Sequence, residues 1–113
     1  MITLDAQSKK IGRIASQAAS FLMGKDLPTF SRNKTPITKV HIINASKAYL
    51  TEKKLQSLIY SRYSGYPGGL KKESGKNLLK RRGASQLFRV AISGMLPKNR
   101  LKKNMLKRLT ISE

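Results

Sequence analysis

The stretch from Arg89 to Leu109 constrains the fold of this chain most, because it holds an apolar helix end, a sharp break and then a helix whose outward side is almost all cation. Four apolar residues fall at i, i+4, i+5 and i+8, which is one helical face: Leu101, Met105, Leu106 and Leu109. Lys and Arg fill most other positions, and no carboxylate occurs between Glu73 and Glu113. Gly94 and Pro97 separate this helix from the preceding one. The pattern predicts a helix with one side buried and the other facing a strongly negative partner.

The charge of the whole chain indicates the same kind of partner. Its 113 residues hold 24 Lys and Arg against 5 Asp and Glu, a net charge of +19. Such a domain repels itself unless an anion neutralises it. Nucleic acid supplies dense and regular negative charge, so it is the favoured partner.

Other partners and compartments fit less well. A membrane-surface protein needs a long basic amphipathic helix with aromatic anchors, whereas this chain has no Trp and 6% aromatic residues. No apolar run approaches the ~20 residues of a membrane span, and the N-terminal MITLDAQSKK has no signal-peptide core. The lack of Cys excludes disulfides and thiolate metal sites. We therefore expect a cytoplasmic protein.

The first half of the chain reads as a strand–helix–strand unit. Residues Met1–Ala6 alternate apolar and polar side chains and predict a short strand. A helix follows to Met23, with Ser8 as its N-cap and Gly24 at the left-handed C-cap. Val40–Ala45 is an apolar run typical of a buried parallel strand. The crossover between the two strands should be right-handed.

The second half is more basic and more helical. We expect a third strand in Leu55–Tyr63, a loop at Ser64–Leu70, helices on either side of Gly83 with Ser85 capping the second, and a last strand at Leu109–Ser112. Met95 and Met105 are expected in the core. The prediction is one domain, residues 1–113, of the α/β class. It has a small parallel sheet of about four strands, helices on both faces and a basic helical C-terminal third.

Enzyme chemistry has little support. The five acids are widely spaced, and the only histidine, His41, lies within an apolar strand. Asp5 follows the first strand, but without the glycine fingerprint of a nucleotide site it reads as a helix-entry or salt-bridge residue. No metal-ligand cluster is visible. We therefore expect no catalytic residues, no metal and no cofactor.

The loop SGYPGG admits a structural and a functional interpretation. Its glycines permit a tight turn, and they also let backbone N–H groups approach phosphate oxygens closely: Gly65, Gly68 and Gly69. Cations and rings suited to phosphates and to base stacking flank the loop: Arg62, Tyr63, Tyr66, Lys71 and Lys72. In a chain of this charge, RNA contact is the favoured interpretation.

Other basic clusters extend this prediction over the chain. Lys9, Lys10 and Arg13 lie at the start of the first helix, where they oppose its dipole until an anion binds. Lys80, Arg81 and Arg82 form a run with no acid between them. The remaining predicted contacts are Lys25, Arg32, Lys34, Lys98, Asn99, Arg100, Lys102, Lys103, Lys107 and Arg108. This spread suits an irregular folded RNA better than one helix in a duplex groove.

Five segments, taken together, carry a family resemblance: residues 5–6 with 11–15, 24–25, 40–47, 60–69 and 90–109. The chain resembles the large-subunit ribosomal protein family thirteen, in its bacterial or organellar branch. The most specific segment is GMLPKN at residues 94–99, followed by a Met-Leu-x-x-Leu helix. Among the departures, Arg62 and Tyr63 stand where the family often has histidines, and Lys102-Lys103 replaces a Gly-Arg pair.

The resemblance implies a three-layer α/β/α fold with a four-stranded parallel sheet. It also implies binding to large-subunit ribosomal RNA (rRNA), an early place in assembly and neighbouring large-subunit proteins. By this likeness Arg13, the loop Gly65–Gly69 and the segment Lys98–Arg108 are the leading RNA contacts.

The resulting hypothesis is a structural constituent of the large ribosomal subunit that is not a homo-oligomer. It would lie in the cytoplasm, or in an organelle matrix if the chain is organellar. The alternative is a free-standing basic regulator that binds DNA or RNA.

Overall fold

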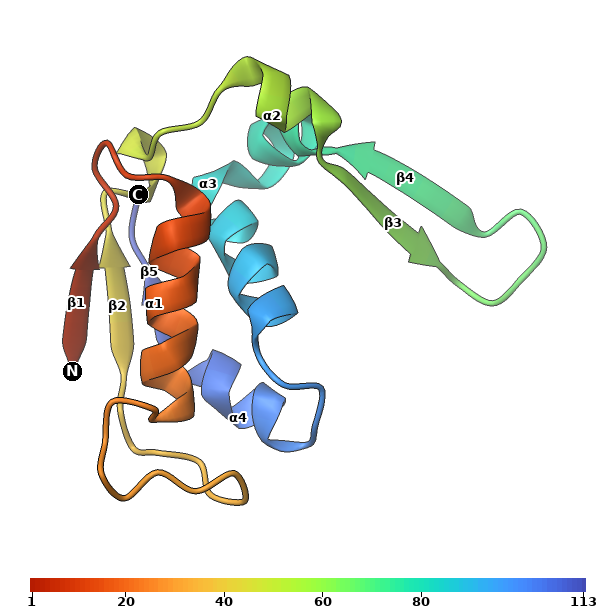
Figure 1. The fold of residues 1–113 in the computed structure, drawn as a ribbon. Helices are drawn as coiled ribbons and strands as arrows, with labels where there is room; N and C mark the ends of the chain where they lie inside the picture. The colour runs from red at the N-terminus through yellow and green to blue at the C-terminus, as the bar shows by residue number, and fades with distance from the viewer.

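A computed structural model describes all residues, 1–113, as a small mixed α/β fold (Figure 1). The elements in chain order are β1 (Ile2–Asp5), α1 (Ile11–Met23), β2 (Val40–Ile43), a 3-10 turn η1 (Ala45–Lys47), α2 (Glu52–Ser57), β3 (Ile59–Tyr63), β4 (Leu70–Ser74), α3 (Gly75–Met95), α4 (Leu101–Lys107) and β5 (Leu109–Ile111). The predicted α/β class and the single β1–α1–β2 unit are confirmed. No helix combines the length and apolarity that a membrane span requires.

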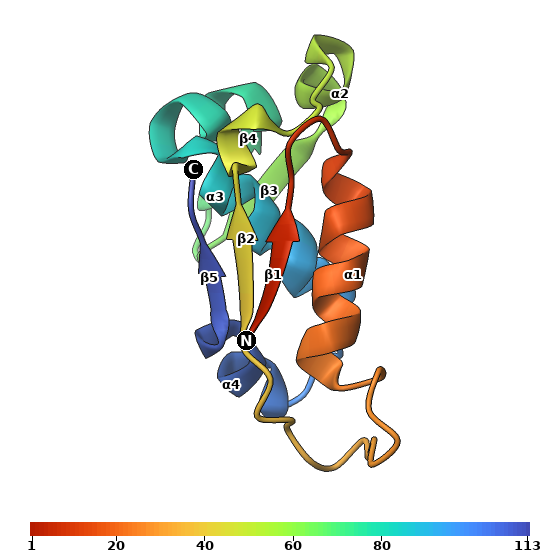
Figure 2. The same ribbon diagram turned by 90° about the vertical axis from the view of Figure 1, so that its left-hand side faces the viewer.

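The parallel sheet has three strands, in the order β1-β2-β5, and not the expected four. Ile2 pairs with Val40, and Val40 pairs with Leu109, so inward-facing apolar residues are aligned across the sheet. Exposure alternates along the strands, and Thr3 and Thr110 on the other face are exposed. Figure 2 shows α1, α3 and α4 behind this sheet, with a right-handed β1–α1–β2 crossover. Helices therefore cover one face, and the predicted third layer is absent.

Helix α1 packs against the sheet through its apolar stripe, which includes the buried Ile14, Ala18 and Leu22. The left-handed C-cap at Gly24 is confirmed, with φ of 79° and its N–H donated to the carbonyl of Phe21. The predicted N-cap is wrong. Ser8 lies in the turn before the helix with φ of 57°, and Lys10 occupies the N-cap position without a side-chain hydrogen bond. The helix start thus leaves backbone N–H groups without a side-chain cap.

The prediction that Leu55–Tyr63 forms a third strand of the parallel sheet is wrong. Residues 52–57 form α2, and β3 pairs with β4 in an antiparallel hairpin that projects from the body (Figure 1). The antiparallel pairing of β3 with β4 has a geometric reason, because a parallel connection needs a dozen or more residues. The loop between Tyr63 and Leu70 has only six, so it can only return the chain as a hairpin. Strand β4 was not predicted.

The C-terminal half follows the predicted breaks closely. Gly83, at φ 79° and ψ 177°, divides α3 into two helical segments as expected. Ser85 does not cap the second segment, because its side chain accepts no hydrogen bond from the backbone; its own N–H donates to the carboxylate of Glu113 at 3.4 Å. Met105 is buried as predicted, whereas Met95 is 44% exposed, so its assignment to the core was wrong.

Candidate nucleic-acid interface

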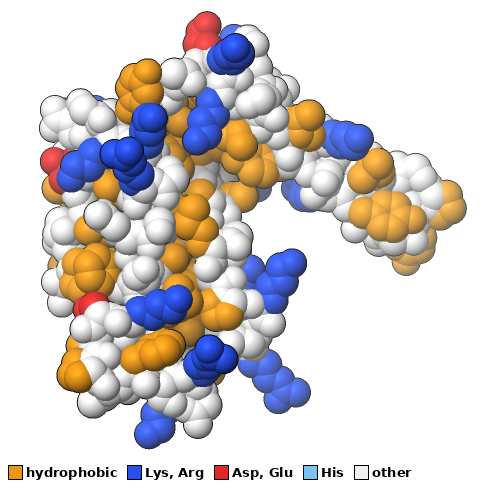
Figure 3. Space-filling model, in the orientation of Figure 1, with side chains coloured by type: hydrophobic (Ala, Val, Ile, Leu, Met, Phe, Trp, Pro, Cys, Tyr) orange, Lys and Arg blue, Asp and Glu red, His pale blue; other side chains and the backbone are white.

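The charged groups of this protein are almost all unpaired. Arg81 and Glu73 form its one salt bridge, at 2.7 Å. The predicted contact residues are exposed apart from the half-buried Gly69, Lys102 and Arg108. Figure 3, in the orientation of Figure 1, shows Lys and Arg from one end of the visible face to the other, with few acidic groups between them. The surface is therefore positive in several places at once.

The first cluster surrounds the start of α1, as predicted. Lys9, Lys10 and Arg13 line a hollow of about 610 Å³ together with Tyr49, which is 54% exposed. The N–H of Tyr49 donates to the carbonyl of Lys9 at 2.9 Å, which holds this aromatic ring beside the cations. The first turn of α1 contains no acid. Both the helix dipole and the side chains therefore favour an anion here.

The second cluster is the β3–β4 hairpin. Its loop turns through Gly65 and Gly68, whose φ angles are 88° and 75°. Arg62 lies directly opposite Lys71 in the strand register. Facing like charges destabilise a strand pair unless an anion lies between them. Tyr63 and Tyr66 are 67% and 76% exposed, so rings and cations are presented together, as the sequence predicted.

The base of the hairpin meets the first segment of α3. Glu73 of β4 accepts hydrogen bonds from Arg81 at 2.7 and 2.9 Å, and these bonds lower the pKa of Glu73 and raise that of Arg81. Nearby Arg62 and Arg82 lower the pKa of Glu73 further. Burial raises the pKa of Tyr60 in the same region. Arg81 is thus a positioning residue for the hairpin, while Lys80 and Arg82 stay exposed.

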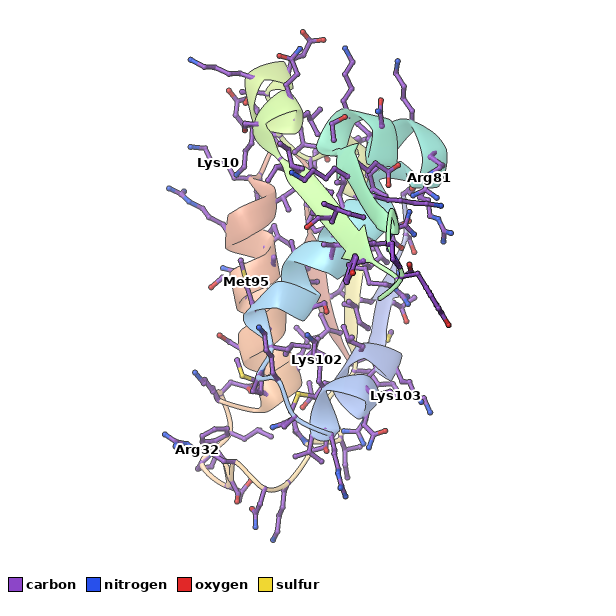
Figure 4. The ribbon with its side chains drawn as sticks, turned by 90° about the vertical axis from the view of Figure 1, so that its right-hand side faces the viewer. Lys10, Arg32, Arg81, Met95, Lys102 and Lys103 are labelled. Atoms are coloured by element: carbon purple, nitrogen blue, oxygen red, sulfur yellow. The ribbon has the colours of Figure 1, made fainter.

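The third cluster joins segments that are far apart in sequence. Lys25, Arg32 and Lys34, from the connector between α1 and β2, share a pocket of about 330 Å³ with Asn99, from the turn before α4. Met23, Phe30, Ser31, Pro97 and Met105 complete the lining. We call it the connector pocket. Figure 4 places Arg32, and with it the connector pocket, at one end of the molecule, and Lys10 and Arg81 at the opposite end.

The fourth cluster is the outer side of α4 and the turn before it. Lys98, Arg100, Lys103 and Lys107 are exposed there, as the one-sided pattern predicted. Lys102 is half-buried. Arg108 is half-buried too, and one of its guanidinium nitrogens is sealed from solvent without a hydrogen-bond partner. Arg108 is therefore less available to an external ligand than its charge suggested.

Two aromatic residues of these clusters were missed. Phe30 stands among the cations of the connector, an interleaving of ring and charge that was visible in the sequence. Tyr49 had no such signal, because only the fold brings it to the start of α1, beside Lys10.

The residues considered for catalysis have structural roles. Asp5 accepts hydrogen bonds from the Asn44 side chain and the Gln7 N–H, each at 3.0 Å, and the bond from Asn44 lowers its pKa most. Asp5 therefore holds the turn that leads into α1, which agrees with a role in helix entry, and it forms no salt bridge. His41 Nε2 lies 2.7 Å from the Ser112 hydroxyl, on the open face of the sheet. No group of three or more His, Cys, Asp and Glu side chains is placed to hold a metal ion.

Comparison with known proteins gives one consistent result. The family model described as "Ribosomal protein L13" matches residues 1–113. "Large ribosomal subunit protein uL13" of Caldanaerobacter subterraneus subsp. tengcongensis is 45% identical over 108 residues, covering 96% of this chain and 75% of that protein. The protein of the same name from Pseudothermotoga lettingae is also 45% identical, covering 96% and 73%. That from Geobacter sp. strain M21 is 41% identical, covering 96% and 75%.

Proposed function

The chain belongs to the ribosomal protein L13 family, and from that premise we propose that it binds large-subunit rRNA through the four basic clusters described above. As a family member it is a structural constituent of the large ribosomal subunit, with rRNA and other ribosomal proteins as its partners. This role is structural and not enzymatic. It acts within the ribosome, and we propose that it does not form a homo-oligomer.

One observation carries the proposal: a single ion pair among 24 cations. A folded protein with this imbalance has positive groups that only an external polyanion can neutralise. The clusters lie at opposite ends of the molecule and on a projecting hairpin (Figures 1 and 4). One straight duplex cannot reach all of them, whereas a folded RNA can contact them from several sides. By offsetting phosphate repulsion, the protein would hold RNA segments together and assist early assembly.

Salt dependence tests this mechanism directly. Each phosphate that the protein neutralises contributes roughly 0.7–0.9 to the slope of log affinity against log salt concentration. We expect a slope of several units for binding to a large-subunit rRNA fragment, measured by filter binding between low and moderate salt. A flat dependence would reject charge neutralisation as the mechanism.

Sedimentation distinguishes this role from that of a free-standing regulator. In a density gradient of cell extract, the protein should travel with large subunits and be scarce in the free pool. A protein found mainly free would favour the regulator.

A further inference from the structure

We propose that the connector pocket binds one unpaired nucleotide of the large-subunit rRNA, with its base stacked on Phe30 and its phosphates held by the surrounding cations. This inference rests on the proposed function and deepens it, because it names a site and a mode of recognition. It concerns Phe30, an uncharged side chain that an argument from charge alone would not identify.

The pocket has the size and apolar floor that a single base requires. Its volume of about 330 Å³ is at the small end of the range for small-ligand sites, ≈ 300–1,000 Å³. Met105 in the floor is 3% exposed and belongs to the hydrophobic core, so the floor is firmly packed. Phe30 is 42% exposed and does not belong to that core. An aromatic ring left open above an apolar floor is suited to stacking with a flat base.

The backbone of the connector holds Phe30 in place before any ligand arrives. The N–H of Phe30 donates to the carbonyl of Leu27 at 3.2 Å, and that of Lys34 donates to the carbonyl of Ser31 at 3.4 Å. The hydroxyl of Ser31 bonds the side chain of Asn33. Pro36 packs against Gly24, so closely that a Cβ there would lie 3.0 Å from the proline ring. The connector is thus folded back on α1, and little ordering remains for binding to impose.

The rim of the pocket is complementary to a nucleotide. Lys25, Arg32 and Lys34 have no salt-bridge partner, since Glu73 and Arg81 form the only ion pair. The side-chain oxygen of Asn99 accepts the N–H of Lys102 at 3.2 Å. This fixes the amide, and its NH₂ group makes no hydrogen bond within the chain, so it can donate to a base edge. Cations, a ring and an amide donor together fit a nucleotide better than a free phosphate or an acidic peptide.

A fluorescent reporter tests the stacking. The chain contains no Trp, so Phe30→Trp introduces a single indole into the pocket. The probes are in vitro transcribed large-subunit rRNA, a short oligoadenylate, a blunt RNA duplex of the same phosphate content, and polyglutamate. We expect quenching of this indole by the rRNA and by the oligoadenylate, and little by the duplex or polyglutamate. Thr3→Trp, at an exposed site on β1 that lies on the open face of the sheet and outside all four clusters, is the control and should respond to none of them.

An affinity measurement separates stacking from charge. Phe30→Ala should lower rRNA affinity between about fivefold and a hundredfold, the range for loss of one base–aromatic stack, and leave the salt slope unchanged. Lys34→Ala should lower both the affinity and the slope, the slope by roughly one unit. Thermal unfolding of Phe30→Ala should match the wild type, because Phe30 is outside the core.

The outcomes distinguish the two proposals. Tight, salt-dependent rRNA binding by the Phe30→Trp variant with no quenching of its indole, or with equal quenching by the duplex, would overturn the nucleotide site and leave the proposed function intact. Quenching by polyglutamate as strong as by RNA would also overturn it, in favour of an acidic protein segment. Failure of rRNA to bind the wild type at low salt would reject the proposed function, and the nucleotide site with it.

Discussion

Gly83 is the residue at which backbone conformation most restricts this chain. Its φ of 79° with ψ of 177° lies in a region that essentially only glycine occupies. It redirects the chain between the basic run at residues 80–82 and the buried second segment of α3. We expect Gly83→Ala to lower the free energy of unfolding by about 1–3 kcal/mol, the usual cost of such strain. Urea unfolding monitored by circular dichroism measures this change.

Gly94 supplies the matched control for that prediction. It lies in the same helix with a negative φ, and a Cβ at its position would meet nothing within 4 Å. Gly94→Ala should therefore stabilise the protein by roughly 0.5–1 kcal/mol, because alanine is the better helix former. Equal effects of the two substitutions would contradict a special role for Gly83.

Glu73 should make stability depend on pH. Its pKa in the folded protein is lowered from 4.5, chiefly by hydrogen bonds from Arg81. The contribution of the carboxylate is therefore complete above that ordinary value, and it is lost as the pH falls through the lowered folded value. We expect wild type to be more stable than Glu73→Gln at neutral pH, with the gap closing in acid. Thermal unfolding across a pH series measures the gap.

The same substitution should act in the opposite direction on RNA binding. Without Glu73, Arg81 and its neighbours Arg62 and Arg82 face solvent with no carboxylate beside them. Glu73→Gln should therefore raise rRNA affinity while lowering stability.

Glu52→Gln is the control for the stability prediction. It removes an exposed acid that forms no salt bridge, and we expect no comparable loss of stability from it. A stability gap that stayed constant into strong acid would show that the ion pair does not stabilise the fold.

At the scale of elements, the sequence predicted what hydrophobic pattern determines. Helix α1, strand β2 and the one-sided α4 each carry their own apolar pattern, so their predicted bounds lie close to those in the structure. Strand β4, with the sequence LKKES, has no such pattern. It is a strand because a short glycine loop returns it against β3, and that cause is not local. The basic clusters were predictable for the same reason, since charge must stay outside, but the pocket around Phe30 requires residues 30 and 99 to meet in space.

The hairpin should be dispensable for folding and important for binding. Most of its residues are exposed, so it contributes little to the core. Replacing Ser61–Lys72 by Asn-Gly joins Tyr60 to Glu73, which already face each other, through a two-residue turn. We expect the unfolding free energy to stay within about 0.5 kcal/mol. Because three cations are removed, the salt slope of rRNA binding should fall by about two to three units. A large loss of stability would contradict this division of roles.

At the scale of the whole molecule, a small core opposes a large charge. Only 21 of the 113 residues are buried, and the extents are 45 × 37 × 18 Å. The radius of gyration is 15.0 Å, against about 13 Å for a compact domain of about 100 residues. At 0.01 M salt the Debye length is about 30 Å, so cations repel one another across the full thickness, whereas at 0.1 M it is about 10 Å. The free protein is therefore stabilised by salt, and the bound protein by RNA.

This balance predicts opposite salt dependences of folding and of binding. The melting temperature of the free protein should rise between low and moderate NaCl, because screening relieves self-repulsion, while rRNA affinity falls over the same range. Lys39→Gln with Lys53→Gln removes two exposed cations that belong to none of the four clusters. This double variant should melt higher at low salt and show a shallower rise, with its rRNA salt slope unchanged. If the melting temperature of the wild type did not depend on salt, repulsion among its cations would not limit its stability. The claim that these cations need a polyanion to neutralise them would then be wrong.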